Sequence, residues 1–144
     1  MRNFVTTLIV GGTLAACSTQ SDQPDFDGQW HVTKATMAGQ NLPDTVSDTM
    51  KLSINGNSYT SESMGQIETG TLKFDFEASP VRIDITAIEG PMAGTNLKAI
   101  GEVNTNTARF SYNVPGITSD DYPSTFESTA QNGYLVLTLE RRSN

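Results

Sequence analysis

The chain has 144 residues, of which 36% are hydrophobic and 17% charged, and its formal net charge at pH 7 is −7. This length and composition predict one globular domain and exclude a disordered chain. The acidic charge excludes electrostatic attraction to the phosphates of a nucleic acid partner. It also excludes attraction to anionic lipid headgroups, so attachment to a membrane needs another cause.

Residues 1–16 have the pattern of a secretory signal peptide. Arg2 and the amino terminus supply its positive charge, and the apolar run 4–14 follows them. That run is about 11 residues long, whereas a helix that crosses a bilayer needs roughly 20. We therefore expect a leader that is cleaved after Ala16.

The four residues at 14–17, Leu-Ala-Ala-Cys, resemble the lipobox of bacterial lipoproteins. In that motif the cysteine thiol accepts a diacylglycerol before cleavage. Cys17 is the only cysteine of the chain, and a free thiol at the start of an exported protein would be a liability. The resemblance implies lipid attachment at Cys17, and two or more acyl chains, palmitate among them, anchor a protein stably. The alternative is that Cys17 is an ordinary apolar residue of the leader.

Residues 17–25 combine this cysteine with a polar stretch that contains one proline. Such a composition predicts an extended, flexible tether, which could span about 25 Å at full stretch. Ser18 directly after the cysteine resembles the sorting signal for the outer membrane. We therefore expect a protein of the bacterial cell envelope, anchored in the outer membrane and facing the periplasm.

From Phe26 onward the chain alternates between apolar and polar residues, which is typical of half-buried strands. Turn residues separate the strands, and Asn55-Gly56-Asn57 is the strongest hairpin signal. A short helical turn is expected at 42–49, where Pro43 could begin it. The pattern predicts an all-β domain, either an up-and-down antiparallel barrel or a sandwich. The eight expected strands are 28–37, 50–54, 58–63, 70–77, 81–86, 96–103, 108–114 and 134–142.

Gly28-Gln29-Trp30 resembles the G-x-W signature of lipocalins and related calycin barrels. The order of motifs over 25–142 resembles a family of lipocalin-like domains of secreted proteins and lipoproteins, known mainly from planctomycetes and verrucomicrobia. The most specific part of this resemblance is the stretch IDITAIEGPMAGTNLKAIGEV at 83–103. The chain departs from the family in being poorer in lysine and in having an irregular stretch at 113–121. The resemblance implies a small eight-stranded lipocalin-like barrel over 26–142 and carries no catalytic residues.

In lipocalins an arginine from a late strand stacks on the signature tryptophan and closes the floor of the barrel. Arg141 shares the inward parity of Leu135, Leu137 and Leu139. The resemblance therefore implies a structural floor made of Gly28, Trp30 and Arg141, with a cation–π contact between the last two. The alternative is that Arg141 is solvated at a frayed terminus.

No arrangement of residues that would support catalysis can be assembled from the sequence. His31 is the only histidine and has outward parity, so neither a zinc site nor a Ser-His-Asp triad is expected. The acidic stretches 25–28 and 119–121 lack the ligand spacing of an EF-hand. Asp84 and Glu102 also have outward parity. We expect no enzyme, no metal and no cofactor.

The remaining candidate activity is ligand binding. We expect the protein to be a monomer. The ligand would be a small apolar molecule held in or at the mouth of the barrel. The alternative is a structural or protein-interaction module of the envelope with a solid core, because bulky inward residues can fill a barrel of eight strands. Small residues at 99, 101 and 108 favour a cavity. The candidate cavity residues are Phe74, Phe76, Ala99, Phe110, Tyr112 and Leu137.

Overall fold

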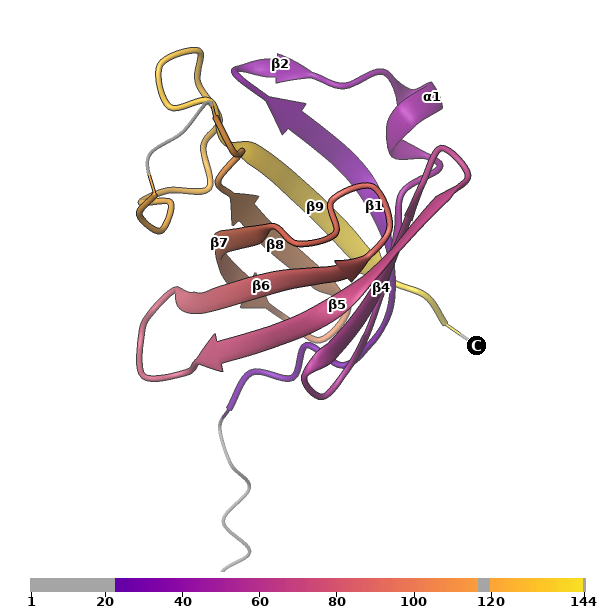
Figure 1. Cartoon of the computed structure of the whole chain (residues 1–144), viewed down its shortest axis with the longest axis vertical. Coiled ribbons are helices and arrows are strands. Elements are labelled where there is room, and N and C mark those ends of the chain that lie inside the picture. Colours follow the sequence, from indigo (N-terminus) through magenta and orange to yellow (C-terminus); the bar gives the residue numbers. More distant parts are fainter. Residues whose placement is uncertain (1–22, 117–119, 144) are drawn as a thin grey trace, which may run out of the picture.

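A computed structural model describes residues 23–116 and 120–143 of the chain. In these residues nine strands form one antiparallel sheet, and eight of them close into a barrel because the first strand pairs with the last (Figure 1). The expected leader, lipidated cysteine and most of the tether lie outside the described residues. The barrel strands are β1 (Gly28–Met37), β3 (Lys51–Asn55), β4 (Ser58–Ser63), β5 (Gln66–Asp75), β6 (Val81–Glu89), β7 (Asn96–Val103), β8 (Thr107–Tyr112) and β9 (Leu135–Arg141).

The pairing of β1 with β9 decides between a barrel and a sandwich, the two architectures that the strand pattern left open. β1 pairs with β3 over its first residues and with β9 over almost its whole length, from Trp30 opposite Arg141 to Met37 opposite Leu135. A sandwich would keep free edges between two sheets, whereas a closed barrel leaves none. The prediction of an eight-stranded antiparallel barrel is confirmed.

A short extra strand and one helical turn lie beside the far end of β1. The strand β2 (Gln40–Asn41) pairs with the last residues of β1, and α1 (Asp44–Ser47) follows it directly. Pro43 precedes the helix, where its missing N–H costs no hydrogen bond. Both elements lie at the top of Figure 1, and the segment 23–27 enters at the opposite end. No helix in the described ranges is long and apolar enough to cross a membrane.

The hairpin between β3 and β4 turns where its sequence predicts, although the two loop residues are Gly56 and Asn57 and not Asn55 and Gly56. Asn55 pairs with Ser58, so Gly56 and Asn57 form the two-residue loop. Gly56 has a φ of 59°, which a residue with a Cβ adopts only at a cost, and glycine in this first position is typical of a type II′ turn.

In the segment between β8 and β9, residues 113–134, of which 117–119 are not described, the part around Tyr122 packs over the outer face of the barrel. The Tyr122 hydroxyl donates a 2.6 Å hydrogen bond to Asp84, and the Arg82 guanidinium lies 5.0 Å from the centre of the Tyr122 ring. Ile100 and Ser111 point away from the barrel interior, yet both are buried. We call 113–134 the outer strap.

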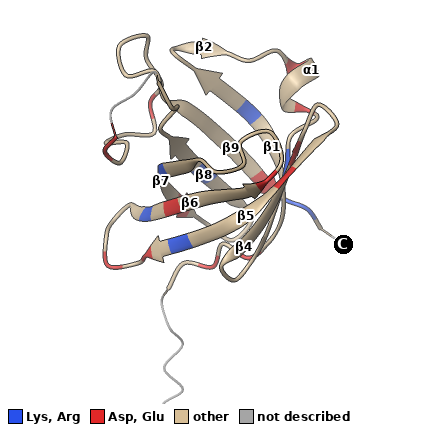
Figure 2. Ribbon diagram, in the orientation of Figure 1, with Lys and Arg blue, Asp and Glu red and all other residues tan. Residues whose placement is uncertain are grey.

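The charged residues of the described chain are scattered over strands and loops, and both signs occur along most of the barrel (Figure 2). Several of them form isolated pairs on the outer surface, for example Arg109 with Glu102. Such exposed pairs contribute little to stability. The barrel is therefore held together by its strand pairing and its apolar interior.

Candidate functional site

The interior of the barrel contains a cavity of about 320 Å³ that opens at the end where β1 finishes. This volume lies at the lower end of the range for small-molecule sites. Residues from all eight barrel strands line it, and most of them are apolar. The apolar lining residues are Val32, Met37, Met50, Leu52, Ile54, Leu72, Phe74, Ile83, Ile85, Met92, Leu97, Phe110, Val114, Pro115, Leu135 and Leu137.

The structure places the expected cavity residues in two groups. Phe74, Phe110, Tyr112 and Leu137 line the cavity. Phe76 and Ala99 are not among the lining residues in the described part of the chain. The Phe76 ring stacks on Phe74 at 5.2 Å and is 36% exposed.

The reason for the position of Phe76 is that β5 ends at Asp75. The Asp75 carboxylate accepts a hydrogen bond from the backbone N–H of Glu77, which starts a turn and ends the alternation. Ala99 is fully buried in the wall of the barrel, between Ile83 and Tyr112 in the strand register.

Small residues on β7 give the neighbouring rings the room to pack. A Cβ on Gly101 would lie 3.0 Å from both the Phe110 ring and the Ile83 side chain, which is tighter than ordinary contact. Phe110 therefore packs over Gly101, and it also lies 5.7 Å from the ring of Phe26. The small residues thus serve wall packing, while larger apolar residues border the cavity itself.

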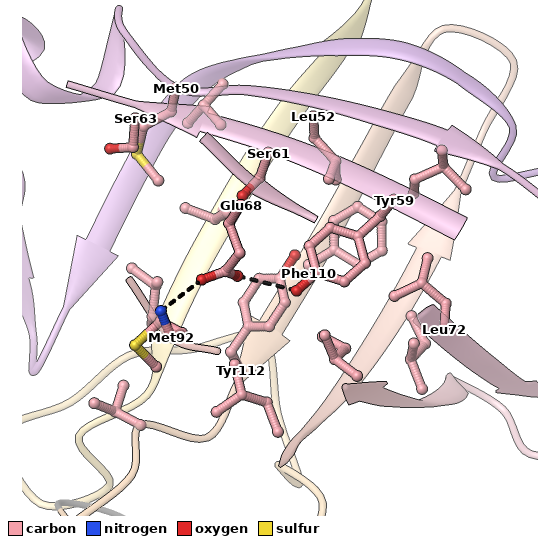
Figure 3. A pocket seen from close by; sticks show the side chains of 18 of the residues that line it. Met50, Leu52, Tyr59, Ser61, Ser63, Glu68, Leu72, Met92, Phe110 and Tyr112 are labelled. Atoms are coloured by element: carbon pink, nitrogen blue, oxygen red, sulfur yellow. Dashed lines mark hydrogen bonds between the residues drawn. The ribbon is translucent and has the colours of Figure 1, made fainter. Parts of the chain in front are cut away.

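The cavity also holds a polar cluster, which we define as Tyr59, Glu68 and Tyr112 (Figure 3). The Tyr59 hydroxyl donates a 3.0 Å hydrogen bond to Glu68 Oε1, and the Met92 backbone N–H donates one of 3.2 Å to Glu68 Oε2. Burial, and then the hydrogen bond to Glu68, raise the pKa of Tyr59. Burial also raises the pKa of Tyr112, and the neighbouring Tyr59 adds to this. Both phenols therefore keep their protons near neutral pH.

A glycine on β5 makes room for the Tyr59 ring. A Cβ on Gly70 would lie 2.7 Å from Tyr59 and 2.1 Å from the Thr86 carbonyl oxygen, which no real side chain tolerates. The pairing of β5 with β6 is irregular between Thr69 and Gly70. This close approach lets Tyr59 lie flat along the wall, with its hydroxyl directed at Glu68. Neither Tyr59 nor Glu68 is predicted from the sequence to be a site residue, although Tyr59 belongs to a predicted strand.

The opposite end of the barrel is closed by the floor. The Arg141 guanidinium carbon lies 4.2 Å from the centre of the Trp30 ring, and the Trp30 indole N–H donates a 3.0 Å hydrogen bond to the Phe26 carbonyl. Trp30 is fully buried. Gly28 has a φ of +129°, and a Cβ there would lie 2.6 Å from Arg141 Nη1. The three residues that the G-x-W resemblance brought together thus lie in contact.

The mouth of the cavity has an apolar rim, which we define as Met37, Met64, Ile67, Ile88 and Met92. These residues come from strand ends and loops at the open end, and Met64, Ile67 and Ile88 are more than half exposed. Lys51 and Glu62 also border the mouth, where their charged groups lie 3.9 Å apart.

The other residues that the sequence raised as chemical candidates lie on the outside of the barrel. His31 Nε2 is 3.7 Å from Glu140, and the histidine side chain is 44% exposed. Asp84 accepts the hydrogen bond from Tyr122, and Glu102 pairs with Arg109. Within the described ranges, no three His, Cys, Asp or Glu residues are grouped closely enough to hold a metal ion. Cys17 lies outside those ranges.

No protein-family model, curated protein or solved structure matches this chain.

Proposed function

We propose that this chain is a lipid-anchored protein of the bacterial cell envelope that binds a small apolar ligand in its barrel and catalyses no reaction. The observation that carries the binding function is the apolar cavity of about 320 Å³, which is open at one end and lies in a barrel whose other end holds the contact between Trp30 and Arg141. An apolar cavity gains free energy by removing apolar ligand surface from water. The G-x-W resemblance supports a lipocalin-like domain, whose fold suits this role.

The proposed location follows from the leader and Cys17, with the outer membrane and a periplasmic orientation suggested by Ser18. The described end of the tether, residues 23–25, lies next to Phe26 at the floor of the barrel. A lipid on Cys17 would therefore be joined to the floor side, and the mouth would be the end away from the attachment. The ligand would then enter from the aqueous side.

A cavity-blocking substitution tests ligand binding. Ser61 lines the cavity, whereas its neighbour Thr60 is exposed on the outer face of the same strand. We expect Ser61→Phe to weaken binding of a neutral apolar dye, such as N-phenylnaphthylamine, by about tenfold or more. The control Thr60→Phe adds an aromatic ring on the outside and should bind the dye as the native protein does.

Equal dye binding by Ser61→Phe and the native protein would place the dye outside the barrel and contradict the proposal. A second measurement is native mass spectrometry of protein purified from the membranes of its own host. A copurified small molecule, lost in Ser61→Phe and kept in Thr60→Phe, is the expected result.

A second candidate function is binding of a partner protein at the apolar rim. Met64 and Ile67 are 68% and 59% exposed, and exposed apolar residues around a concave site are typical of interaction surfaces. Replacing both by Ser leaves the cavity lining unchanged. If the rim binds a partner, this double variant loses a copurified protein while its dye binding is preserved.

A further inference from the structure

The charged residues that line the cavity have a net negative charge. Glu68, Lys51 and Glu62 are the charged residues of the described chain that line the cavity. Lys51 and Glu62 lie at the mouth and pair with each other. Glu68 is partly buried and lies one residue pair farther in along β4 and β5, between Met92 of the rim and the Tyr59 hydroxyl. No cation within salt-bridge distance accompanies it in the described ranges, so the cavity wall just inside the mouth carries an uncompensated carboxylate.

The hydrogen-bonding groups around this carboxylate have a surplus of acceptors. An ionised carboxylate offers about four acceptor positions, and Tyr59 and the Met92 N–H occupy two of them. Because the Tyr59 proton is directed at Glu68, its oxygen can only accept a further hydrogen bond. Figure 3 shows Glu68, Tyr59 and Tyr112 facing one another across the same part of the cavity. A ligand group placed there is best matched if it donates several hydrogen bonds.

The apolar surroundings strengthen the effect of the charge. Interactions between charges grow as the local dielectric falls, and most of the cavity wall is apolar. A ligand carboxylate near Glu68 would be repelled, whereas a protonated amine would be attracted. The faces of Tyr59 and Tyr112 add to this preference, because aromatic rings attract cations.

We propose that the ligand of the cavity is a small apolar molecule that carries a protonated amine, with the amine bound by Glu68, Tyr59 and Tyr112 and the apolar part held among the leucine, isoleucine and phenylalanine side chains. This proposal rests on the proposed ligand-binding function. It replaces the general expectation of an apolar ligand with a chemical class, and it separates amines from fatty acids.

Three probes with the same alkyl chain test the proposal: decylamine, decanol and decanoate, each below its micelle concentration at pH 7. Titration calorimetry of the native protein should show decylamine binding at least about tenfold tighter than decanoate, with decanol between them. Because this comparison uses the native protein alone, it does not depend on the folding of any variant.

Glu68→Gln locates the effect, since glutamine keeps an acceptor for Tyr59 and removes the charge. We expect this variant to lose about tenfold in affinity for decylamine, to gain affinity for decanoate and to bind decanol almost unchanged. The control is Glu77→Gln, which changes the net charge equally at an exposed residue of the turn after β5. It should leave all three affinities unchanged.

The outcomes separate the amine proposal from the binding function. If decanol and decanoate bind as tightly as decylamine, or if Glu68→Gln and Glu77→Gln have equal effects, the amine proposal is overturned and the binding function stands. If none of the three probes binds, and the neutral dye does not bind either, the binding function itself fails.

Discussion

Arg141 joins three segments of the chain at the floor of the barrel. Its Nε donates a 3.1 Å hydrogen bond to the Thr105 carbonyl, and its terminal nitrogens donate to the carbonyls of Asp25 and Asp27. The plane of the guanidinium covers the buried Trp30 ring. Arg141 therefore connects the last strand, the turn before β8 and the segment that precedes β1.

This arrangement predicts a coupled loss of stability at Trp30 and Arg141. Trp30→Ala removes a fully buried large ring and should lower the free energy of unfolding by about 3–5 kcal/mol. Arg141→Ala should cost about 0.5–2 kcal/mol through the lost cation–π contact, and its lost hydrogen bonds to backbone carbonyls add to this. The loss in the double variant should be smaller than the sum of the two single losses, because both substitutions remove the cation–π contact. Urea unfolding of the four proteins measures the cycle.

Arg142→Ala is the matched control, since Arg142 is the exposed neighbour of Arg141. It should change the stability little and add independently to Trp30→Ala. Strict additivity of the Trp30 and Arg141 losses would show that the arginine does not stabilise the protein through the tryptophan. Fluorescence of Trp30, the only tryptophan, should be blue-shifted and resistant to iodide in the native protein.

Side-chain contacts help to hold the outer strap, an irregular element, against the barrel. Tyr122 is clamped by the hydrogen bond to Asp84 and by Arg82 and Lys98, whose charged groups lie 5.0 and 5.1 Å from the centre of its ring. The hydrogen bond to Asp84 raises the pKa of Tyr122. Farther along, Arg109 lies over the Phe126 ring at 4.5 Å. These contacts turn outward-facing charged residues into a docking surface for the strap.

Tyr122→Phe tests the strap at the level of one atom. Losing the hydroxyl removes the hydrogen bond to Asp84 and should lower the free energy of unfolding by about 1 kcal/mol. Tyr134→Phe removes the same atom from the other end of the strap, where the hydroxyl makes no hydrogen bond to described residues. Denaturant unfolding of both variants should show a loss for Tyr122→Phe and little change for Tyr134→Phe. Similar values for the two would mean that Asp84 does not hold the strap.

Strand boundaries show which elements are predictable from local pattern. The strands β4 and β7 have the predicted bounds, 58–63 and 96–103, but β5 begins at Gln66 instead of Gly70. Ile67 is 59% exposed at the rim, so the first part of β5 lacks the apolar–polar alternation that a half-buried strand shows. Pairing with β4 extends the strand there, and the register joins Glu68 to Ser61.

At the scale of the whole molecule, the barrel has a closed floor where the chain enters and an open mouth at the other end. In the proposed arrangement the tether and a lipid on Cys17 lie on the floor side. The protein would then be held in the membrane by the lipid alone, since its acidic charge gives no attraction to anionic lipids. Acyl chains supply about 0.8 kcal/mol per buried methylene.

Cys17→Ser tests this anchor. Without the thiol no diacylglycerol can be attached, so we expect the variant to leave the membrane fraction and to remain an uncleaved precursor. Cell fractionation and intact-protein mass spectrometry measure both effects. Ser18→Ala, which changes the neighbouring residue and keeps the thiol, should stay lipidated and cleaved. A Cys17→Ser protein that is cleaved normally and still sediments with membranes would contradict lipidation at this residue.

The sequence by itself determined the all-β class and most strand positions. Alternation is a local property, because successive side chains of a strand point to opposite faces. The floor partners Gly28, Trp30 and Arg141 were expected only from the resemblance to the G-x-W signature. What the sequence left open was how the strands close and what their inner face encloses. Pairing of β1 with β9 joins the two ends of the domain, and no local pattern encodes such a contact.

Only the tertiary structure decided that the interior is incompletely filled and where its polar groups lie. Tyr59 and Glu68 belong to separate strands, and they meet because Gly70 lets the tyrosine lie against the wall. Phe76 appeared inward by parity, but the turn after Asp75 carries it to the surface. The volume of a cavity depends on how all the inward side chains pack together, since each occupies space that the others would otherwise leave empty. The volume of the cavity is therefore defined only when the barrel is closed.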